Sequence, residues 1–434
     1  MRLSVLIFLS LAIWSDADLI HKFSTTVDPC DDFHKFVCNE QGNNGSSPLV
    51  QQLHRGLRAR LRDALVKESD ELLRLFEQVS EDFDRVTVVG LEKQDFRDYH
   101  YANAEHFRDY YNLLFVKFIL QENLISRAWK AELQQMFEKV KAKVTELVTA
   151  ITWLPADTKT AIIEELRAKR VILGLPDHLE DLDFVEELIF KVHNNFGLLR
   201  RQALKNRSNL TLSDYEQMLH DAYDKIVVDD KGKDTVTVRF SSPVPDLINS
   251  FFQQNSSVGV VNFAKDHILN EFTYVNENDN NVIYLSPNII YFPDSLPRVY
   301  KPHFAFVFAY LLLDRVATHY NFSEIGDPAV WECYENNSIE GLSVYSVEAF
   351  RLIANMLTDT SKPLGTYEPF GIGSENFNQI QLFAAALESK WCSVDINIPQ
   401  SYAPTQQFQR SFGCRPEQKL FRKKEDVEKC RLFN

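Results

Sequence analysis

The side chains of this chain that could bind a metal or transfer protons do not fall into a known catalytic spacing. No two of its eleven histidines lie four residues apart, so the zinc motif H-E-x-x-H, in which two His on one helical face bind zinc and the Glu acts as general base, is absent. Asp314 and His319 are five residues apart, about 140° around a helix, and we interpret them as surface polar residues. Glu216, His220 and Asp224 have the spacing of one helical face, for which a solvated charged surface is the favoured interpretation.

A nucleophilic hydroxyl or thiol is not predicted either. The sequence contains no G-x-S-x-G motif and no phosphate-binding P-loop. Six cysteines, an even number, indicate three disulfides if the chain is secreted. Zinc binding by these cysteines is disfavoured because no two of them have the C-x-x-C spacing. The six are Cys30, Cys38, Cys333, Cys392, Cys414 and Cys430. We therefore predict no catalytic residue, no metal ligand and no cofactor, with zinc on non-standard ligands as the alternative.

The first residues predict secretion. Met1 and Arg2 precede an apolar run from Leu3 to Trp14, and small residues end at Ala17, which fits a cleaved signal peptide over residues 1–17. The run is short of the roughly twenty residues that cross a bilayer, and an uncleaved signal anchor is the alternative. Sequons of the form N-x-S/T support a glycosylated extracellular protein. Their asparagines are Asn44, Asn206, Asn209, Asn255, Asn321 and Asn336.

Charge and hydropathy disfavour two classes of partner. The formal net charge is −14 and there is no basic stripe, which argues against nucleic acid and against anionic membrane surfaces. The most apolar later segment, Phe304 to Leu313, is ten residues long and suits a buried core helix. We therefore expect no nucleic-acid partner and no membrane span after signal cleavage.

The spacing of apolar residues predicts a mainly α-helical chain with a small β-hairpin or edge sheet. Apolar residues from Leu133 to Ile151 recur at three- and four-residue steps, which predicts a long amphipathic helix broken at Trp153–Asp157. Further helices are predicted over residues 158–172 (ended by Gly174), 300–319, 346–357 and 376–391. The polar segment 276–280 predicts a turn, and β-branched and aromatic residues around Ser286-Pro287-Asn288 predict a hairpin.

Several stretches have the residue pattern of a known family. Asp28–Cys38 fits D-P-C-x-D-F-x-x-F-x-C, in which two cysteines stand among fixed aromatic and acidic positions. Further matches are Thr152–Asp177 with T-W-M…T-K…I-G-Y-P-D, Asn281–Pro293 with N-A-x-Y…F-P, Gln381–Cys392 with Q-L-F…W-C, and the closing segments Phe408–Cys414 and Cys430–Phe433. On these residues the chain resembles the neprilysin and endothelin-converting-enzyme family of zinc metallopeptidases. The resemblance is good at both ends and around 140–180 and faint between, and the chain is shorter than a family ectodomain.

The resemblance implies a disulfide pairing and a peptide-binding residue. All six cysteines fall on family positions, which implies Cys30–Cys414, Cys38–Cys392 and Cys333–Cys430. Asn281 falls on the family asparagine that binds the substrate backbone, on an edge strand that could pair with an extended peptide. An asparagine satisfied by its own loop is the alternative interpretation.

The resemblance also locates what this chain lacks. It places the family's zinc-binding helix at 300–319, where large apolar side chains stand in place of ligands. Glu348 is the one candidate for the third ligand, and we interpret it as a weak one. The family's transition-state His and positioning Arg have no counterpart in residues 398–407.

These observations lead to one set of expectations. We expect a neprilysin-like, shortened two-lobed fold, with an N-terminal helical region over 18–275 and a degenerate metallopeptidase-like C-terminal domain over 276–434. The expected function is that of a secreted pseudo-peptidase that binds an extracellular peptide or protein, for example an active family member. The alternatives are an active zinc metalloendopeptidase with non-standard ligands and a purely structural extracellular role.

Overall fold

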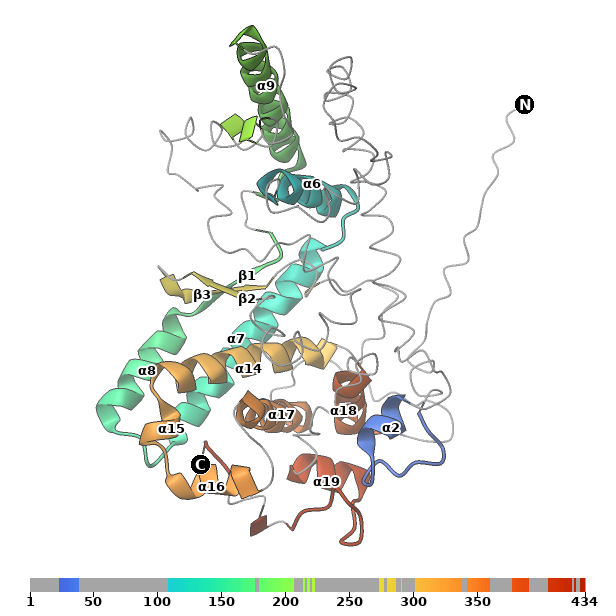
Figure 1. Ribbon diagram of the computed structural model, residues 1–434. Helices are drawn as coiled ribbons and strands as arrows, with labels where there is room; N and C mark the ends of the chain where they lie inside the picture. The colour runs from blue at the N-terminus through green and yellow to red at the C-terminus, as the bar shows by residue number, and fades with distance from the viewer. Residues whose placement is uncertain are drawn as a thin grey trace, which may run out of the picture. The chain divides into compact units, whose positions relative to one another are not determined.

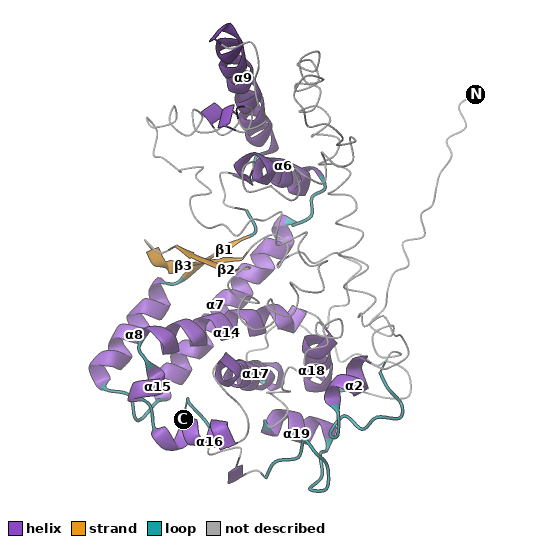
Figure 2. Ribbon diagram, in the orientation of Figure 1, coloured by secondary structure: helices purple, strands orange, loops and turns teal. Residues whose placement is uncertain are grey.

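The structure is a computed structural model, and its described part is mainly helical, as the apolar spacing predicts (Figures 1 and 2). It describes residues 23–38, 108–175, 179–206, 214, 217–218, 221–222, 273–276, 279–285, 290, 301–336, 342–359, 377–389, 405–423, 425–426 and 430–433. The predicted signal peptide, 1–17, lies outside these residues. No helix among them is both long and apolar enough to cross a membrane.

Contacts divide the chain into two compact units that interleave along the sequence. Unit 1 comprises Met1–Val50, Gln135–Ala168 and Phe292–Asn434, and unit 2 comprises Gln51–Gln134 and Lys169–Tyr291. The predicted division after residue 275 follows the order of the chain, whereas these units are assembled from separate stretches. One reason is covalent, because the bridge Cys30–Cys414 joins two stretches of unit 1 that are 384 residues apart.

The core of unit 1 is built around α14 (Lys301–His319), which packs against α17 (Leu342–Thr358) and α18 (Gln379–Ser389). In turn α18 contacts α2 (Phe33–Cys38) and α19 (Gln406–Phe412). The described part of this unit also contains α8 (Ala156–Ala168), α15 (Phe322–Ile325) and α16 (Pro328–Asn336). The predicted helices at 300–319, 346–357 and 376–391 are therefore present, with ends that differ by a few residues.

The long amphipathic helix predicted from Leu133 to Ile151 is α7 (Arg127–Ala150), whose residues belong to both units. Most of its predicted apolar face is inaccessible to solvent: Leu133, Phe137, Val140, Val144 and Val148 are all 0% exposed, whereas Leu147 is only partly buried. Side chains three and four residues apart share one helical face, so the sequence spacing alone determines this buried stripe.

In unit 2, α6 (Arg108–Gln121) packs against α9 (Leu182–Asn206), and three short strands form a sheet in the order β1-β3-β2. β1 (Arg170–Leu173) pairs in parallel with β3 (Asp279–Leu285), and β2 (Thr273–Asn276) pairs antiparallel with β3.

One local prediction in this region is wrong. The helix predicted over 158–172 ends at Ala168, and Ile172 lies in β1, because pairing of β1 with β3 overrides local helix propensity. The hairpin predicted around Ser286-Pro287-Asn288 falls on residues outside the described part of the chain; β3 has β2, which precedes it, as its antiparallel partner, and Ile290 is helical. The predicted turn at 276–280 lies between the end of β2 at Asn276 and the start of β3 at Asp279, and residues 277–278 are outside the described part.

Gly174 follows β1 rather than ending a helix. Its φ is +72°, its N–H donates to the Leu285 carbonyl at 2.7 Å, and a Cβ would lie 2.8 Å from Ile125 Cδ1 and 2.9 Å from Ile290 Cδ1. The left-handed backbone conformation therefore favours glycine, and a Cβ here would also require the two isoleucine side chains to shift.

Candidate functional site

The helix on which the resemblance places the zinc ligands, α14, is buried nearly all round. Phe308 and Leu312 are 0% exposed. The Phe308 ring lies 5.4 Å from the ring of Phe137 on α7, and the Phe306 ring lies 6.3 Å from that of Phe383 on α18. Burial stabilises such a helix at about 25 cal/mol per Å² of apolar surface. The prediction that this helix is a packed core element is confirmed.

Glu348, the one candidate for a third zinc ligand, belongs to a buried hydrogen-bond network. Its Oε1 accepts from the Tyr334 hydroxyl, from Arg351 Nη1 at 2.6 Å and from the Leu432 backbone N–H at 3.3 Å. Arg351 Nη1 also donates to the Cys430 carbonyl at 2.5 Å. Glu348 and Arg351 are 5% and 7% exposed. The carboxylate therefore compensates a buried guanidinium and anchors the last residues of the chain, so these side chains do not fit a zinc ligand set.

Burial and charge set the protonation states of this network. Burial raises the pKa of Tyr334 well above its usual value, and the neighbouring Glu348 carboxylate raises it further. Burial, the largest single effect, lowers the pKa of Arg351, but Glu348 and Tyr334 together outweigh it and the net pKa is raised. At neutral pH the tyrosine is therefore a neutral donor and the arginine is charged, which matches every hydrogen bond in the network.

Asp314 and His319 do not converge on a site. His319 is exposed, and its Nδ1 lies 2.9 Å from Glu165 Oε2 on α8, so its interpretation as a surface residue is confirmed. The same interpretation is wrong for Asp314, which is half-buried; burial raises the pKa of its carboxyl, although Arg315 lowers it. The reason is the packing of α14 on α17: burial first and the Asp314 charge second raise the pKa of Tyr345 on α17 to about 12.

Asn281 lies on β3, which is the central strand of the described sheet and not an edge. Val282, the next residue, pairs with Arg170 of β1, and the register of β2 is irregular between Val275 and Asn276. A peptide could not add to this strand as an edge partner because strands flank it on both sides. Among the described strands the edges are β1 and β2, and the sequence could not reveal this because β1 comes from a distant part of the chain.

The structure bears out two of the three disulfides that the resemblance implies. Cys30–Cys414 and Cys333–Cys430 are present, with Cα atoms 5.5 and 5.2 Å apart. Cys38 is also disulfide-bonded, and its expected partner, Cys392, lies outside the described residues.

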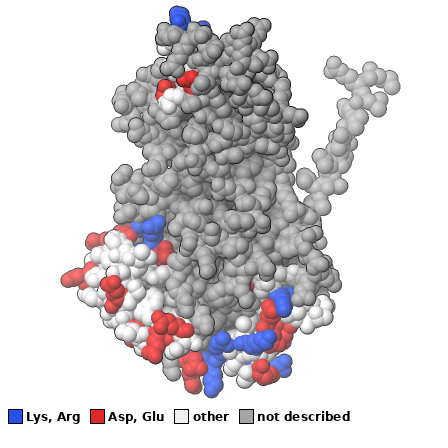
Figure 3. Space-filling model, viewed as in Figure 1, with Lys and Arg blue, Asp and Glu red and all other residues white. Residues whose placement is uncertain are grey.

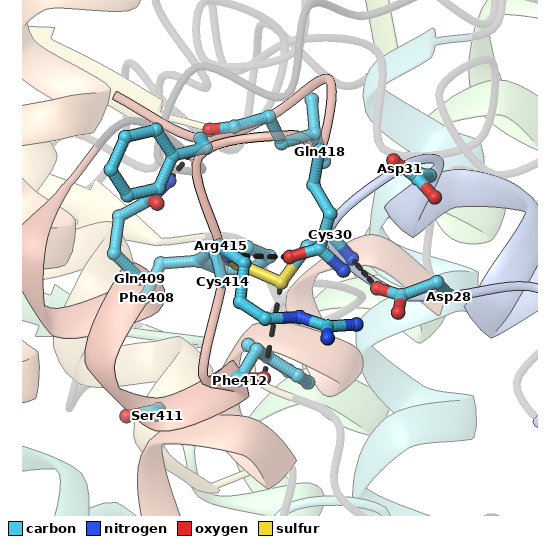
Figure 4. The surroundings of a disulfide bond; sticks show 12 residues. Asp28, Cys30, Asp31, Phe408, Gln409, Ser411, Phe412, Cys414, Arg415 and Gln418 are labelled. Carbon is cyan, nitrogen blue, oxygen red and sulfur yellow. Dashed lines mark hydrogen bonds between the residues drawn. A yellow bond between two sulfur atoms is a disulfide. The ribbon is translucent and has the colours of Figure 1, made fainter. Parts of the chain in front are cut away.

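Hydrogen bonds reinforce the first of these bridges (Figure 4). Asp28 Oδ1 accepts from the Cys30 N–H at 2.8 Å, and the Cys30 carbonyl accepts from the Leu420 N–H at 2.8 Å. Asp31 Oδ1 accepts from the Lys419 N–H at 3.1 Å. The N-terminal segment is therefore fastened to the loop after α19 through both covalent and polar contacts.

The pair His34–Glu388 is a feature that sequence reasoning missed. His34 Nδ1 on α2 lies 2.8 Å from Glu388 Oε1 on α18, and the glutamate is 3% exposed. The same nitrogen lies 3.7 Å from Cys38 Sγ, one helical turn along. The sequence could have predicted the proximity of His34 and Cys38, because residues four apart lie on the same face of a helix. The glutamate was not, since it lies 354 residues away.

The remaining predicted residues are only partly described. Asn321 is exposed at the start of α15 with a φ of 53°, Asn336 is the exposed last residue of α16, and Asn206 ends α9. The other residues named as glycosylation or surface candidates, Asn44, Asn209, Asn255, Glu216, His220 and Asp224, lie outside the described residues. So do residues 398–404 of the segment without the family's His and Arg.

Charges on the face shown in Figure 3 are mixed: the described Lys and Arg side chains lie among Asp and Glu. Within the described part of the chain, no group of three or more His, Cys, Asp or Glu side chains is arranged to hold a metal ion. Comparison of the chain with protein-family models, with curated proteins and with solved structures yields no match in any of the three.

Proposed function

We propose that this chain is a secreted, catalytically inactive relative of the neprilysin-like metallopeptidases that acts by binding an extracellular peptide or protein. One observation carries the proposal: the helix at the family's catalytic position is filled with apolar side chains, and the one candidate for the third ligand serves a buried ion pair. Zinc catalysis needs ligands that converge on an open coordination position, and here the corresponding side chains are committed to packing.

The proposed extracellular location has independent support. Two long-range disulfides are typical of proteins from oxidising compartments. The apolar stretch after Met1-Arg2 has the length and flanks of a secretory signal. Proposed secretion and proposed loss of the catalytic residues together support a binding role. A secreted protein that does not catalyse a reaction would act through contacts of its surface with other molecules.

Catalytic inactivity is tested with the purified secreted protein and a variant rebuilt on α14. The triple variant Phe308→His, Ala309→Glu, Leu312→His restores the H-E-x-x-H spacing. We expect neither protein to retain stoichiometric zinc after dialysis or to hydrolyse fluorogenic peptides, and we expect the variant to be less stable. A variant that binds zinc and cleaves peptides at a rate typical of the family would show that the site is dormant rather than lost.

Binding is tested by adding the purified protein in excess to an active family member and its peptide substrate. If it captures the peptide or the enzyme, hydrolysis slows, and titration of each component separates the two cases. An unchanged rate over a series of extended peptides and active relatives would contradict a role as decoy or regulator.

A further inference from the structure

The long helix α9 of unit 2 has one buried face and one exposed face (green in Figure 1). It packs against α6, and its buried face holds Val185, Leu188, Val192 and Phe196, of which none is more than 1% exposed. On the opposite side of the helix, six exposed residues lie within about 40° of the exposed Asn194, since each residue advances the helix by about 100°. These residues form the α9 stripe: Asp183, Glu187, Phe190, Leu198, Arg201 and Lys205.

Two large apolar side chains occupy the middle of the α9 stripe. Phe190 is 64% exposed and Leu198 is 48% exposed, the two highest values among the described large apolar side chains. A surface helix normally carries polar and charged side chains on the face opposite to its buried one. Exposed apolar side chains that share a face and are bordered by charges are typical of an interaction surface.

The charges of the α9 stripe are separated by sign. The acidic residues Asp183 and Glu187 precede the apolar pair, and the basic residues Arg201 and Lys205 follow it. Acidic side chains near the start of a helix and basic ones near its end also favour the helix dipole. The dipole does not account for the two exposed apolar side chains between them, whereas a partner with the same arrangement accounts for both features.

The α9 stripe is symmetrical about Asn194. In an antiparallel pair of α9 helices with the two Asn194 residues opposite each other, every residue faces the one equally far on the other side of the centre. The facing pairs are then Phe190 with Leu198, Glu187 with Arg201, and Asp183 with Lys205, and each pair occurs twice. A parallel pair would place like charges opposite each other. The order of residues in the stripe therefore favours an antiparallel copy of the same helix.

We propose that this chain forms a two-fold symmetric dimer in which the α9 stripes of two copies pack antiparallel. A two-fold interface uses the same surface on both subunits, and a self-complementary stripe has the pattern that such an interface needs. Because α9 has 25 residues, it extends about 37 Å at 1.5 Å per residue. A contact between two such helices is at the small end of specific interfaces, so we expect a dimer that dissociates on dilution. The dimer does not depend on the proposed loss of catalysis.

The test is sedimentation velocity of the full secreted protein at concentrations from about 1 to 100 μM, a range suited to weak dimers. The average mass should rise from that of a monomer towards that of a dimer. Phe190→Asp should raise the Kd at least about tenfold, because the new charge would face Leu198 of the second copy. The matched control is Ile325→Asp, at a 44% exposed isoleucine on α15, which should leave the Kd unchanged.

Charge reversal tests the antiparallel arrangement. Glu187→Arg should weaken the dimer, because the new cation would face Arg201 of the second copy. The double variant Glu187→Arg, Arg201→Glu makes the facing charges opposite again and should recover the Kd of the unaltered protein. Glu187 also pairs with Lys191 on its own helix at 2.8 Å, but the double variant removes that pair too, so its loss cannot explain a recovery.

The variants are chosen at exposed positions so that loss of association is separable from loss of fold. The unfolding midpoint of each dilute variant should match that of the unaltered protein, because surface substitutions of this kind have small effects on stability. The proposal is overturned if the unaltered protein is a monomer at every concentration or if Phe190→Asp dimerises as strongly. It is also overturned if the double reversal does not recover the association that Glu187→Arg removes.

Discussion

Replacement of Arg351 by methionine should strongly destabilise unit 1, because it leaves the Glu348 carboxylate buried without its cation. The Arg351 and Glu348 side chains are 8% and 5% exposed and 2.6 Å apart, so solvent screens their interaction little. Removal of one partner of such a buried pair costs about 3–5 kcal/mol. That is a large part of a typical total stability of about 5–15 kcal/mol.

The measurement is chemical unfolding followed by tryptophan fluorescence, with two control variants. Arg415→Met removes a similar pair at the surface, where Arg415 and Glu417 are 68% and 65% exposed and 3.4 Å apart. Exposed pairs contribute below about 1 kcal/mol, so this change should barely move the unfolding midpoint. The double variant Glu348→Leu, Arg351→Met removes both charges and should be more stable than Arg351→Met alone.

Two outcomes would refute the reasoning. If Arg351→Met and Arg415→Met have equal midpoints, the buried pair is not a stabilising element of the folded state. If the double variant is no better than Arg351→Met, the destabilisation comes from lost packing or from the freed Cys430 carbonyl and Tyr334 hydroxyl rather than from the stranded carboxylate.

Three further changes test other parts of the structure. Leu312→Asp, at a 0% exposed position, should lower the free energy of unfolding by roughly several kcal/mol because it buries an unpaired charge. Leu198→Asp, at a 48% exposed leucine, should leave the thermal midpoint nearly unchanged. Equal effects of the two variants would mean that α14 is not a core element. Cys414→Ser should reduce the secreted yield, because loss of a native bridge costs about 2–5 kcal/mol, and a normal yield with a free Cys30 thiol would contradict this. The raised pKa of Tyr345, about 12 in the folded state, means that the folded protein holds this proton more tightly than the unfolded chain. The contribution of this protonation to stability is therefore complete below pH about 10 and is lost as the pH rises towards 12. Tyr345→Phe should reduce the fall of the unfolding midpoint over this pH range. An unchanged pH dependence in the variant would contradict the raised pKa of Tyr345.

Local periodicity was sufficient to predict α7, α14, α17 and α18, whereas α6 and α9 were not predicted. The buried face of α7 and the apolar run in α14 depend on neighbours three and four residues apart, which are fixed by helix geometry wherever the helix lies. The absence of H-E-x-x-H is likewise a property of the sequence alone. The two bridges among described cysteines were implied by a resemblance and not by spacing, because spacing leaves many pairings open.

Only the tertiary structure decided which polar residues matter and how. The sequence presented Glu348 as a weak candidate ligand and Asp314 as a surface residue; the structure places Glu348 in a buried ion pair and leaves Asp314 half-buried. Tyr334 and Leu432 reach Glu348 from other elements, and β1 reaches β3 across more than a hundred residues. Contacts between residues so distant in sequence are determined by how the whole chain packs. Buried charges must be paired and buried polar groups must be hydrogen-bonded, whatever the separation of the partners in sequence.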